Sequence, residues 1–139
     1  MLIDSNILVY SINSSSPKHL DAQQFIQKNV GKLEVAHQNI FETLRILTHS
    51  KFPNPMKTSE AIIAIETILD ACNIIAPDYR THRIALALIK KYQIVSNQIF
   101  DAYLAATLIS NGIDTIATDN VRDLQRFSEI KVLNPFSPS

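Results

Sequence analysis

Residues 1–6 read Met-Leu-Ile-Asp-Ser-Asn, a short apolar run that stops at three consecutive small polar residues. Side chains of this kind hydrogen-bond to nearby backbone groups and end a strand. We therefore predict a buried strand over Met1–Ile3 with Asp4 at its end. Thr115–Ala117, with Asp119 shortly after it, has the same character near the other end of the chain. Both segments are predicted to be strands followed by an acid.

Between and beyond these segments, helical and strand patterns alternate. The other predicted strands are Leu33–Ala36, Asn73–Ala76 and Lys131–Leu133. The predicted helices are a short or irregular piece over Ile7–Ile12, Pro17 to about Asn29, Asn39 to the prolines at 53 and 55, a helix beginning at Thr58 or Ser59, Thr81–Tyr92, Phe100–Asn111 and Val121–Phe127. Parallel strands need crossover connections, which helices usually supply. We therefore predict an α/β fold with a mostly parallel, short-stranded sheet flanked by helices, in a single domain over residues 1–139.

The composition excludes several classes of function. The chain has 139 residues, 13 basic and 13 acidic side chains, one cysteine and two glycines. A chain of this size buries about two-thirds of its unfolded surface, so it needs no disulfide or structural metal to form a core. Two isolated glycines cannot form a P-loop or a dinucleotide-binding loop. No apolar stretch approaches the ~20 residues of a membrane span and the start does not look like a leader, so we expect a cytoplasmic protein with no membrane partner.

Four acids stand where a parallel sheet usually binds its ligands, beyond the carboxyl ends of its strands. Asp4 and Asp119 each follow a predicted strand, Asp101 falls in the opening turn of a predicted helix, and Glu42 lies among apolar neighbours in another. Taken singly, each has an ordinary structural interpretation as a turn, capping or solvated helical residue. Together they predict one shared acidic site.

The charge balance favours a metal ion at this site. Without these four acids, 9 of the 13 acidic residues remain against 13 basic ones, so negative charge is concentrated in one place. Clustered carboxylates repel one another unless a proton or a cation neutralises them. Oxygen-only ligand sets select hard ions such as Mg²⁺ or Mn²⁺, and such ions catalyse phosphodiester cleavage through activated water.

Five stretches of the sequence follow one another in a characteristic order: Leu2–Asn6, Gln38–Thr48, Asp101–Ala106, Ala117–Leu124 and the closing Asn134–Phe136. In these stretches the chain resembles the PIN-domain ribonucleases and, among them, the VapC toxins of bacterial and archaeal toxin–antitoxin pairs. The resemblance spans nearly the whole chain. It implies a PIN-like three-layer fold, with the sheet between layers of helices.

The resemblance also implies roles for the residues of the acidic site. Asp4, Glu42 and Asp101 match the family's metal-binding, catalytic carboxylates. Asn6 matches a residue that orients the first of them, and Thr118 matches one that contacts the site.

The fourth acid of the family's site is less sharply placed. It lies one or two residues after the threonine and is either Asp or Asn, so Asp119 is our choice and Asn120 is the alternative. Asp123 is a further candidate for the site, although it also fits a surface position near Arg126. Ser5 stands where the family more often has threonine, which keeps the hydroxyl group.

The same resemblance implies an activity and partners. We expect a Mg²⁺- or Mn²⁺-dependent endoribonuclease, with RNA as its substrate, a cognate antitoxin as its protein partner and a homodimer as its assembly. Basic side chains supply most contacts to nucleic-acid phosphates. The candidates for this role are Arg45, Lys51, Arg80, Arg83, Lys90, Lys91, Arg122 and Arg126.

Two other functions stay open at this stage. A catalytically silent module with the same fold would bind RNA or a protein partner, and the uncertain fourth acid leaves room for it. A phosphatase-like hydrolase would use Asp4 as its nucleophile, but Asn6 stands where such an enzyme needs a second acid. The histidines lack the paired spacing of a zinc site and Cys72 lies on an apolar helix face, so we predict neither zinc nor thiol chemistry.

Overall fold

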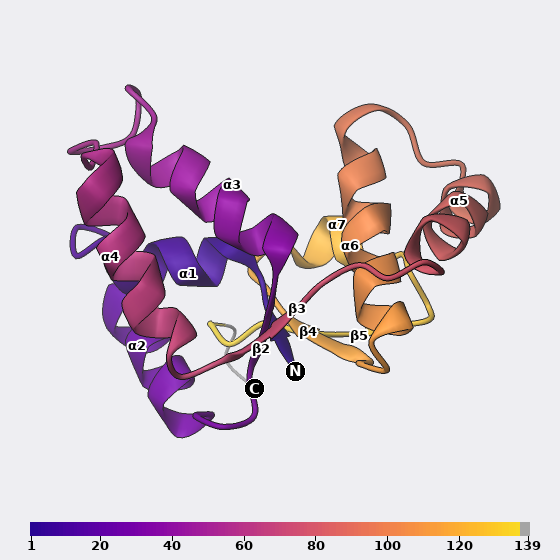
Figure 1. The fold of residues 1–139 in the computed structure, drawn as a ribbon, viewed down its shortest axis with the longest axis horizontal. Helices are drawn as coiled ribbons and strands as arrows, with labels where there is room; N and C mark the ends of the chain where they lie inside the picture. The colour runs from indigo at the N-terminus through magenta and orange to yellow at the C-terminus, as the bar shows by residue number, and fades with distance from the viewer. Residues whose placement is uncertain (137–139) are drawn as a thin grey trace.

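The computed structural model describes residues 1–136, and its centre is a five-stranded sheet in which every pairing is parallel (Figure 1). The strands lie in the order β3-β2-β1-β4-β5. Their bounds are β1 Leu2–Ile3, β2 Glu34–Ala36, β3 Asn73–Ile75, β4 Thr115–Ala117 and β5 Lys131–Leu133. The predicted α/β class is confirmed, and the sheet is parallel throughout its described strands.

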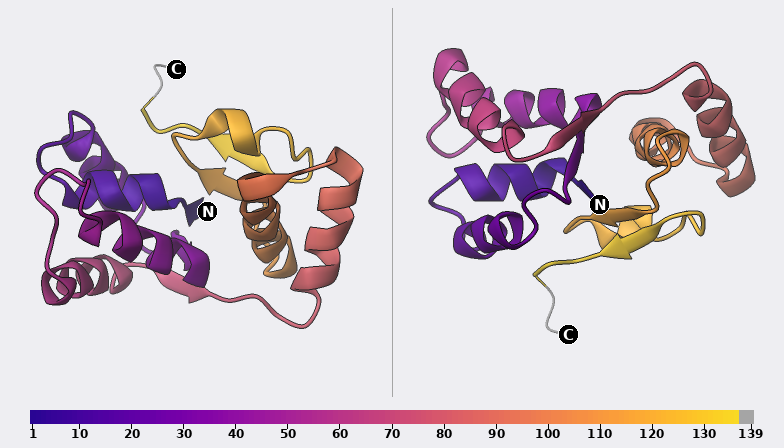
Figure 2. Two further views of the ribbon diagram at one scale, coloured as in Figure 1. Left: turned by 90° about the horizontal axis from the view of Figure 1, so that it is seen from above. Right: turned by 60° about the horizontal axis from the view of Figure 1, so that its bottom comes forward.

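Helices flank the sheet in two groups, α1–α4 on one side of the molecule and α5–α7 on the other, and the view from above shows the same separation (Figures 1 and 2). Their bounds are α1 Ser5–Ile12, α2 His19–Lys28, α3 His37–Thr48, α4 Thr58–Leu69, α5 Thr81–Tyr92, α6 Ile99–Ser110 and α7 Val121–Leu124, with a 3₁₀ turn, η1, at Ser96–Gln98. None of the helices within residues 1–136 is long and apolar enough to cross a membrane.

Successive strand residues point to opposite faces of the sheet, and this alternation builds two cores. Leu2 and Ile116 pair across β1 and β4 and pack against α5 and α6. Ile3 and Ala117, one residue later, pack against α1 and α2 on the other face. A further cluster joins α1, α3 and α4 around the fully buried Leu47. Because both faces of the sheet are covered at β1, both residues of this strand are apolar and fully buried.

The middle position of β1 decides where a site can form. Leu2 is in register with Glu34 of β2 on one side and with Ile116 of β4 on the other. The next two strands in the chain, β2 and β3, lie on one side of β1, and the last two, β4 and β5, lie on the other side. Parallel sheets bind ligands at such a switch point, beyond the carboxyl ends of the strands.

The predicted elements differ from the observed ones mainly at their ends. The helix predicted from Pro17 begins at His19, and no side chain caps it. The segment after β1 is a regular helix, α1, because the Asp4 side chain accepts a hydrogen bond from its first N–H group. The last short helix ends at Leu124, three residues earlier than predicted.

Candidate active site

Asp4 lies at the carboxyl end of β1 and caps α1. Its buried side chain accepts hydrogen bonds at Oδ1 from the Ser5 N–H (2.8 Å) and from Asn39 Nδ2 (3.2 Å). Oδ2 accepts hydrogen bonds from Thr118 Oγ1 (2.8 Å) and from Asn6 Nδ2 (3.4 Å). Burial raises the pKa of Asp4, while the bonds from Thr118 and Ser5 oppose that shift. The carboxylate is thus held in a single orientation.

Glu42 comes from α3, which begins directly after β2. Its Oε2 accepts a hydrogen bond from Ser5 Oγ (2.7 Å), and its Oε1 accepts one from Gln38 Nε2 (2.9 Å). Gln38 Nε2 also donates to the carbonyl oxygen of Phe100 (3.1 Å), which joins α3 to α6. The Oε1 atom of Gln38 is buried and has no hydrogen-bond partner within residues 1–136. Glu42 is therefore anchored to α1 and lies beside an unsatisfied acceptor.

Asp101 lies in the first turn of α6, and its carboxyl group has the most unusual electrostatic surroundings of the site. Burial raises its pKa to about 6, and the negative charges of Asp123, Asp4 and Glu42 push it in the same direction. The guanidinium of Arg126 opposes these effects. The structure therefore brings the acids predicted at positions 4, 42 and 101 into one electrostatic group.

Asp123 of α7 is the acid whose charge affects Asp101 most. Arg126 Nε donates to the Asp123 carbonyl oxygen (2.8 Å), and Arg126 Nη2 lies 3.6 Å from Asp123 Oδ1. Arg126 Nη1 donates to Gln98 Oε1 (3.3 Å), at the start of α6. These contacts tie α7 to the N-terminal end of α6 and place Asp123 in the acidic group.

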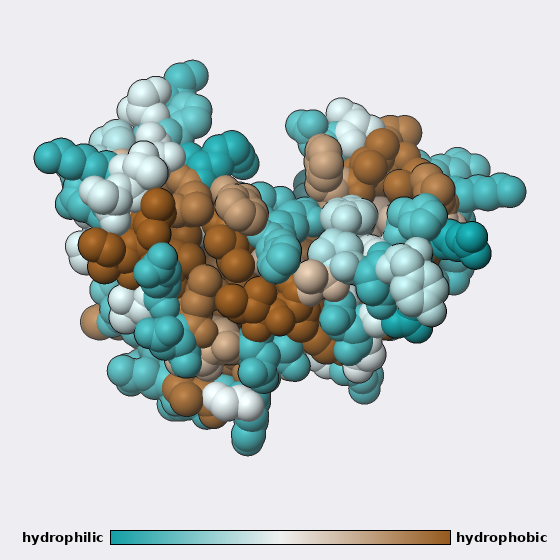
Figure 3. All heavy atoms as spheres, in the orientation of Figure 1, coloured by the Kyte–Doolittle hydropathy of each residue, from teal (hydrophilic) through white to brown (hydrophobic). Residues whose placement is uncertain are grey.

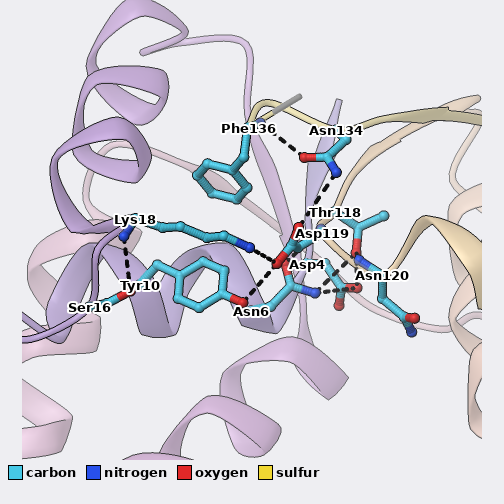
Figure 4. Close-up of polar contacts among 10 residues, drawn as sticks. All are labelled: Asp4, Asn6, Tyr10, Ser16, Lys18, Thr118, Asp119, Asn120, Asn134 and Phe136. Carbon is cyan, nitrogen blue, oxygen red and sulfur yellow. Dashed lines mark hydrogen bonds and ion pairs between the residues drawn. The ribbon is translucent and has the colours of Figure 1, made fainter. Parts of the chain in front are cut away.

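The Asp119 carboxylate has a different set of neighbours (Figure 4). Its Oδ2 accepts hydrogen bonds from Lys18 Nζ (2.5 Å) and from the Tyr10 hydroxyl (2.8 Å). The Lys18 ammonium also lies 5.2 Å from the centroid of the Tyr10 ring and 5.4 Å from that of Phe136. The hydrogen bond from Lys18 holds the pKa of Asp119 below its usual range. The negative charge of Asp119 is thus already compensated by a cation of the same chain.

Asn6 and Thr118 connect Asp119 to Asp4. The Asp119 N–H donates to Asn6 Oδ1 (3.1 Å), and Asn6 Nδ2 donates to Thr118 Oγ1 (3.0 Å). Thr118 Oγ1 in turn donates to Asp4, and it accepts a hydrogen bond from the Asn120 N–H (2.9 Å). Figure 4 shows this chain of contacts along the end of the sheet. Asn6 and Thr118 both lie where the sequence predicts them, in contact with Asp4.

A cleft of about 680 Å³ opens between α3 and α6, and Figure 3 shows the hollow between the two helical groups. Its lining residues are Gln38, Phe41, Glu42, Arg45, Asn97, Phe100 and Asp101. Two acids, one arginine and two aromatic rings thus share one opening. This mixture suits a charged ligand that also has flat apolar parts.

The donor set can be compared with the needs of a metal ion. Within residues 1–136, no three Asp, Glu, His or Cys side chains form a ready-made metal centre. Mg²⁺, however, usually binds through one or two carboxylates and keeps several waters. The acids around Asp101 supply only oxygen ligands, and their mutual repulsion would be relieved by a cation. The unsatisfied Gln38 Oε1 beside Glu42 adds a further oxygen acceptor of the kind that hard cations prefer. The site therefore fits a hydrated hard cation.

The predicted basic side chains do not form one continuous track. Arg45 lines the cleft, and Arg126 lies in the acidic group. Arg80 and Lys91 are instead engaged in ion pairs with acids in their own surroundings. Cys72 is half-buried and packs against the core, as predicted, but it lies in the turn between α4 and β3 and not on a helix face.

Several residues that hold the acids were not predicted from the sequence. Ser5, Gln38 and Asn39 occur in the family-like stretches, but only the structure shows which carboxylate each one contacts. Asn39 offers a weak signal, because it is a polar residue at a fully buried helix position. Lys18 has no sequence signal, since it lies 101 residues from Asp119.

Comparison with known proteins identifies the family. Residues 1–132 match the PIN domain family, and the chain belongs to it. It is 27% identical over 146 aligned residues to Ribonuclease VapC24 of Mycobacterium tuberculosis, covering 97% of this chain and 96% of the relative.

Two solved structures share the fold. VapBC2 from Rickettsia felis, bound to a DNA fragment from its promoter, superimposes with a TM-score of 0.72 at 19% identity and covers 96% of both chains. A toxin–antitoxin complex from Klebsiella pneumoniae superimposes with a TM-score of 0.70 at 19% identity, covering 99% of this chain and 98% of that one. The predicted PIN-like fold is confirmed.

Proposed function

We propose that this protein is a divalent-metal-dependent endoribonuclease and the toxin component of a toxin–antitoxin pair. The observation that carries the proposal is the grouping of Asp4, Glu42, Asp101 and Asp123 around one end of the sheet, at its switch point. The similarity to Ribonuclease VapC24 supports RNA as the substrate.

One or two of the four acids are the proposed direct ligands of Mg²⁺ or Mn²⁺, and the others would face the waters that such an ion keeps. Such an ion, when bound, would supply an activated water and stabilise the attacking and leaving oxygens. Asp4 contributes a carboxylate that Thr118 and Asn6 hold in place. Glu42 and Asp101 contribute carboxylates from the two walls of the cleft, where RNA phosphates can approach them.

We assign Asp119, the fourth acid predicted from the sequence, to a supporting role. Lys18 already compensates its charge, and its backbone N–H holds Asn6 against Thr118 and Asp4. Asp123 takes its place in the proposed ligand set, since it is the acid that acts most strongly on Asp101.

The proposal includes a cognate antitoxin and a homodimer. The likeness in fold to a toxin–antitoxin complex supports a protein partner of that kind. An acidic cleft with an open mouth is also a suitable receptor for a basic side chain of such a partner. The homodimer rests on the family resemblance alone, and sedimentation of the purified protein tests it.

The phosphatase-like alternative has little support in the geometry. Such an enzyme needs a second acid two residues after its nucleophile. The residue there is Asn6, an amide that donates hydrogen bonds to Asp4 Oδ2 and Thr118 Oγ1. The catalytically silent binding module is therefore the alternative that an experiment has to separate.

The decisive experiment is cleavage of a mixed RNA panel by the purified chain in Mg²⁺ or Mn²⁺, with and without EDTA. Asp101→Asn is the test variant, and Asp21→Asn, at an exposed acid of α2, is the matched control. We expect EDTA to abolish cleavage and Asp101→Asn to reduce it at least about 100-fold, because a charge-stabilising group is lost. Asp21→Asn should cleave like the parent. Activity that survives Asp101→Asn would refute the site, and RNA binding without cleavage would favour the silent module.

A further inference from the structure

Two aromatic side chains are exposed in the walls of the acidic cleft. Phe41 of α3 is 67% exposed and Phe100 of α6 is 61% exposed. Both line the cleft, and each directly precedes an acid of the site, Glu42 or Asp101. A single exposed aromatic residue is ordinary, but two that line one cleft from opposite walls, beside two acids and an arginine, indicate a binding surface.

Arg45 supplies positive charge to the same cleft. It lies four residues after Phe41 on α3, so the two side chains project from the same face of the helix. Its guanidinium takes part in no ion pair within residues 1–136. An unpaired arginine beside aromatic rings matches the two needs of single-stranded nucleic acid, which are phosphate contact and base stacking.

We propose that Phe41, Phe100 and Arg45 form a subsite for single-stranded RNA, in which the rings stack on unpaired bases and Arg45 contacts a backbone phosphate. The inference rests on the proposed ribonuclease function and adds to it the residues that would hold the bases and the backbone of an unpaired strand. Bases in an RNA duplex are stacked on one another and paired, so they have no free face for these rings. The polar lining from Gln38 and Asn97 favours a nucleotide over an apolar protein segment as the occupant.

Binding can be measured separately from cleavage. The protein is prepared as Asp101→Asn, and the probe is a short RNA that contains 2-aminopurine, whose fluorescence responds to stacking. The probe is used both alone and annealed to its complement. We expect the single strand to bind at least about tenfold more tightly than the duplex, with a fluorescence change on binding, since stacking on an aromatic ring contributes on that order per base.

Substitutions then locate the subsite. Phe41→Leu and Phe100→Leu in the same background should each weaken binding of the single strand by about 5- to 100-fold, and Phe41→Trp should keep it tight. The matched control is Tyr79→Leu, because Tyr79 is 84% exposed and lies outside the cleft lining. That variant should bind like the parent. Circular dichroism of each variant confirms that it is folded.

Unchanged binding by both leucine variants, or equal affinity for single strand and duplex, would overturn the subsite. It would also be overturned if the leucine variants kept their RNA affinity and lost only a protein partner. If the wild type cleaves RNA while the leucine variants bind normally, the subsite fails and the ribonuclease function stands. If the rings are needed for binding but the wild type cleaves no RNA, the subsite stands and the ribonuclease function fails.

Discussion

Asp101 and Asp119 lie near the same end of the sheet, and their surroundings shift their titration in opposite directions. Burial and neighbouring acids raise the pKa of Asp101 to about 6, whereas the hydrogen bond from Lys18 lowers the pKa of Asp119. Asp101 lines an open cleft, while Asp119 is hydrogen-bonded to Tyr10 as well as to Lys18. The negative neighbours of Asp101 outnumber the one guanidinium near it, that of Arg126, and such an excess can recruit a cation. Asp119, which is paired with an ammonium group, has no such need.

The largest expected effect distinguishes the two candidates for the fourth acid, Asp123 and Asp119, by replacing each one separately. Asp123→Asn should lower kcat/KM for RNA cleavage at least about 100-fold, because it removes a charge from the acidic group. Asp119→Asn should lower it by about tenfold or less, because the backbone N–H that holds Asn6 remains. The measurement is steady-state cleavage in Mg²⁺.

Asp114→Asn is the matched control for this comparison, since Asp114 lies at the opposite end of β4 and pairs with Lys131. It should leave cleavage unchanged. If Asp119→Asn lowered cleavage more than Asp123→Asn, Asp119 would be the fourth acid of the site, as predicted from the sequence. Asp123 would then not belong to the proposed ligand set.

A smaller effect is expected on stability, with a defined dependence on pH. The pKa of Asp101 in the folded chain is about 6, above its value of 3.8 as a free side chain, so the folded state binds more protons between these two pH values. Stability therefore falls as the pH rises from about 4 to about 6, and the penalty persists above that range. Asp101→Asn should raise the melting temperature in EDTA at pH 8 by roughly 3 °C, and this gain should disappear near pH 4.

Asp119 should show the opposite behaviour in the same experiment. Its pKa is lowered on folding, so its contribution to stability is present above its ordinary pKa of 3.8 and is lost as the pH falls through the lowered value. Asp119→Asn should therefore lower the melting temperature at pH 8. Equal shifts for Asp101→Asn and Asp119→Asn would mean that the two carboxylates do not differ as the structure implies.

The smallest effect is expected at Lys18. Lys18→Met keeps the apolar stem but removes the ammonium from Asp119 and from the two rings, and should cost about 1 kcal/mol or less of unfolding free energy, because the pair is partly exposed. Lys18→Arg should keep most of the stability. Urea unfolding at pH 7 measures both variants, and a loss in Lys18→Arg as large as that in Lys18→Met would show that the charge is not what matters.

Several local features could be predicted because they depend on near neighbours in the sequence. The helix over Thr81–Tyr92 and the strands Thr115–Ala117 and Lys131–Leu133 have the predicted bounds, since helical spacing and short apolar runs set them locally. Asp4 could be placed at the site because parallel strands bind ligands beyond their carboxyl ends. The family resemblance implied the places of Asn6 and Thr118, both of which hydrogen-bond to Asp4.

The fourth acid could not be placed in the same way. Asp119 and Asp123 lie within five residues of each other, and both fit the end of the fourth strand. Two long-range contacts separate them: Asp119 is hydrogen-bonded to Lys18, far away in the chain, and the charge of Asp123 acts on Asp101 of α6. Sequence spacing carries no information about such partners.

The sequence by itself determined the α/β class and the alternation of elements, and it indicated candidate acids at positions 4, 42 and 101, because apolar periodicity and the polar ends of strands are local properties. Only the tertiary structure decided which acid has an excess of negative neighbours and which is paired with a lysine. It also decided that Phe41, Arg45 and Phe100 line one cleft. The physical reason is that a pKa and a binding surface depend on groups brought together through space, which are distant in the chain.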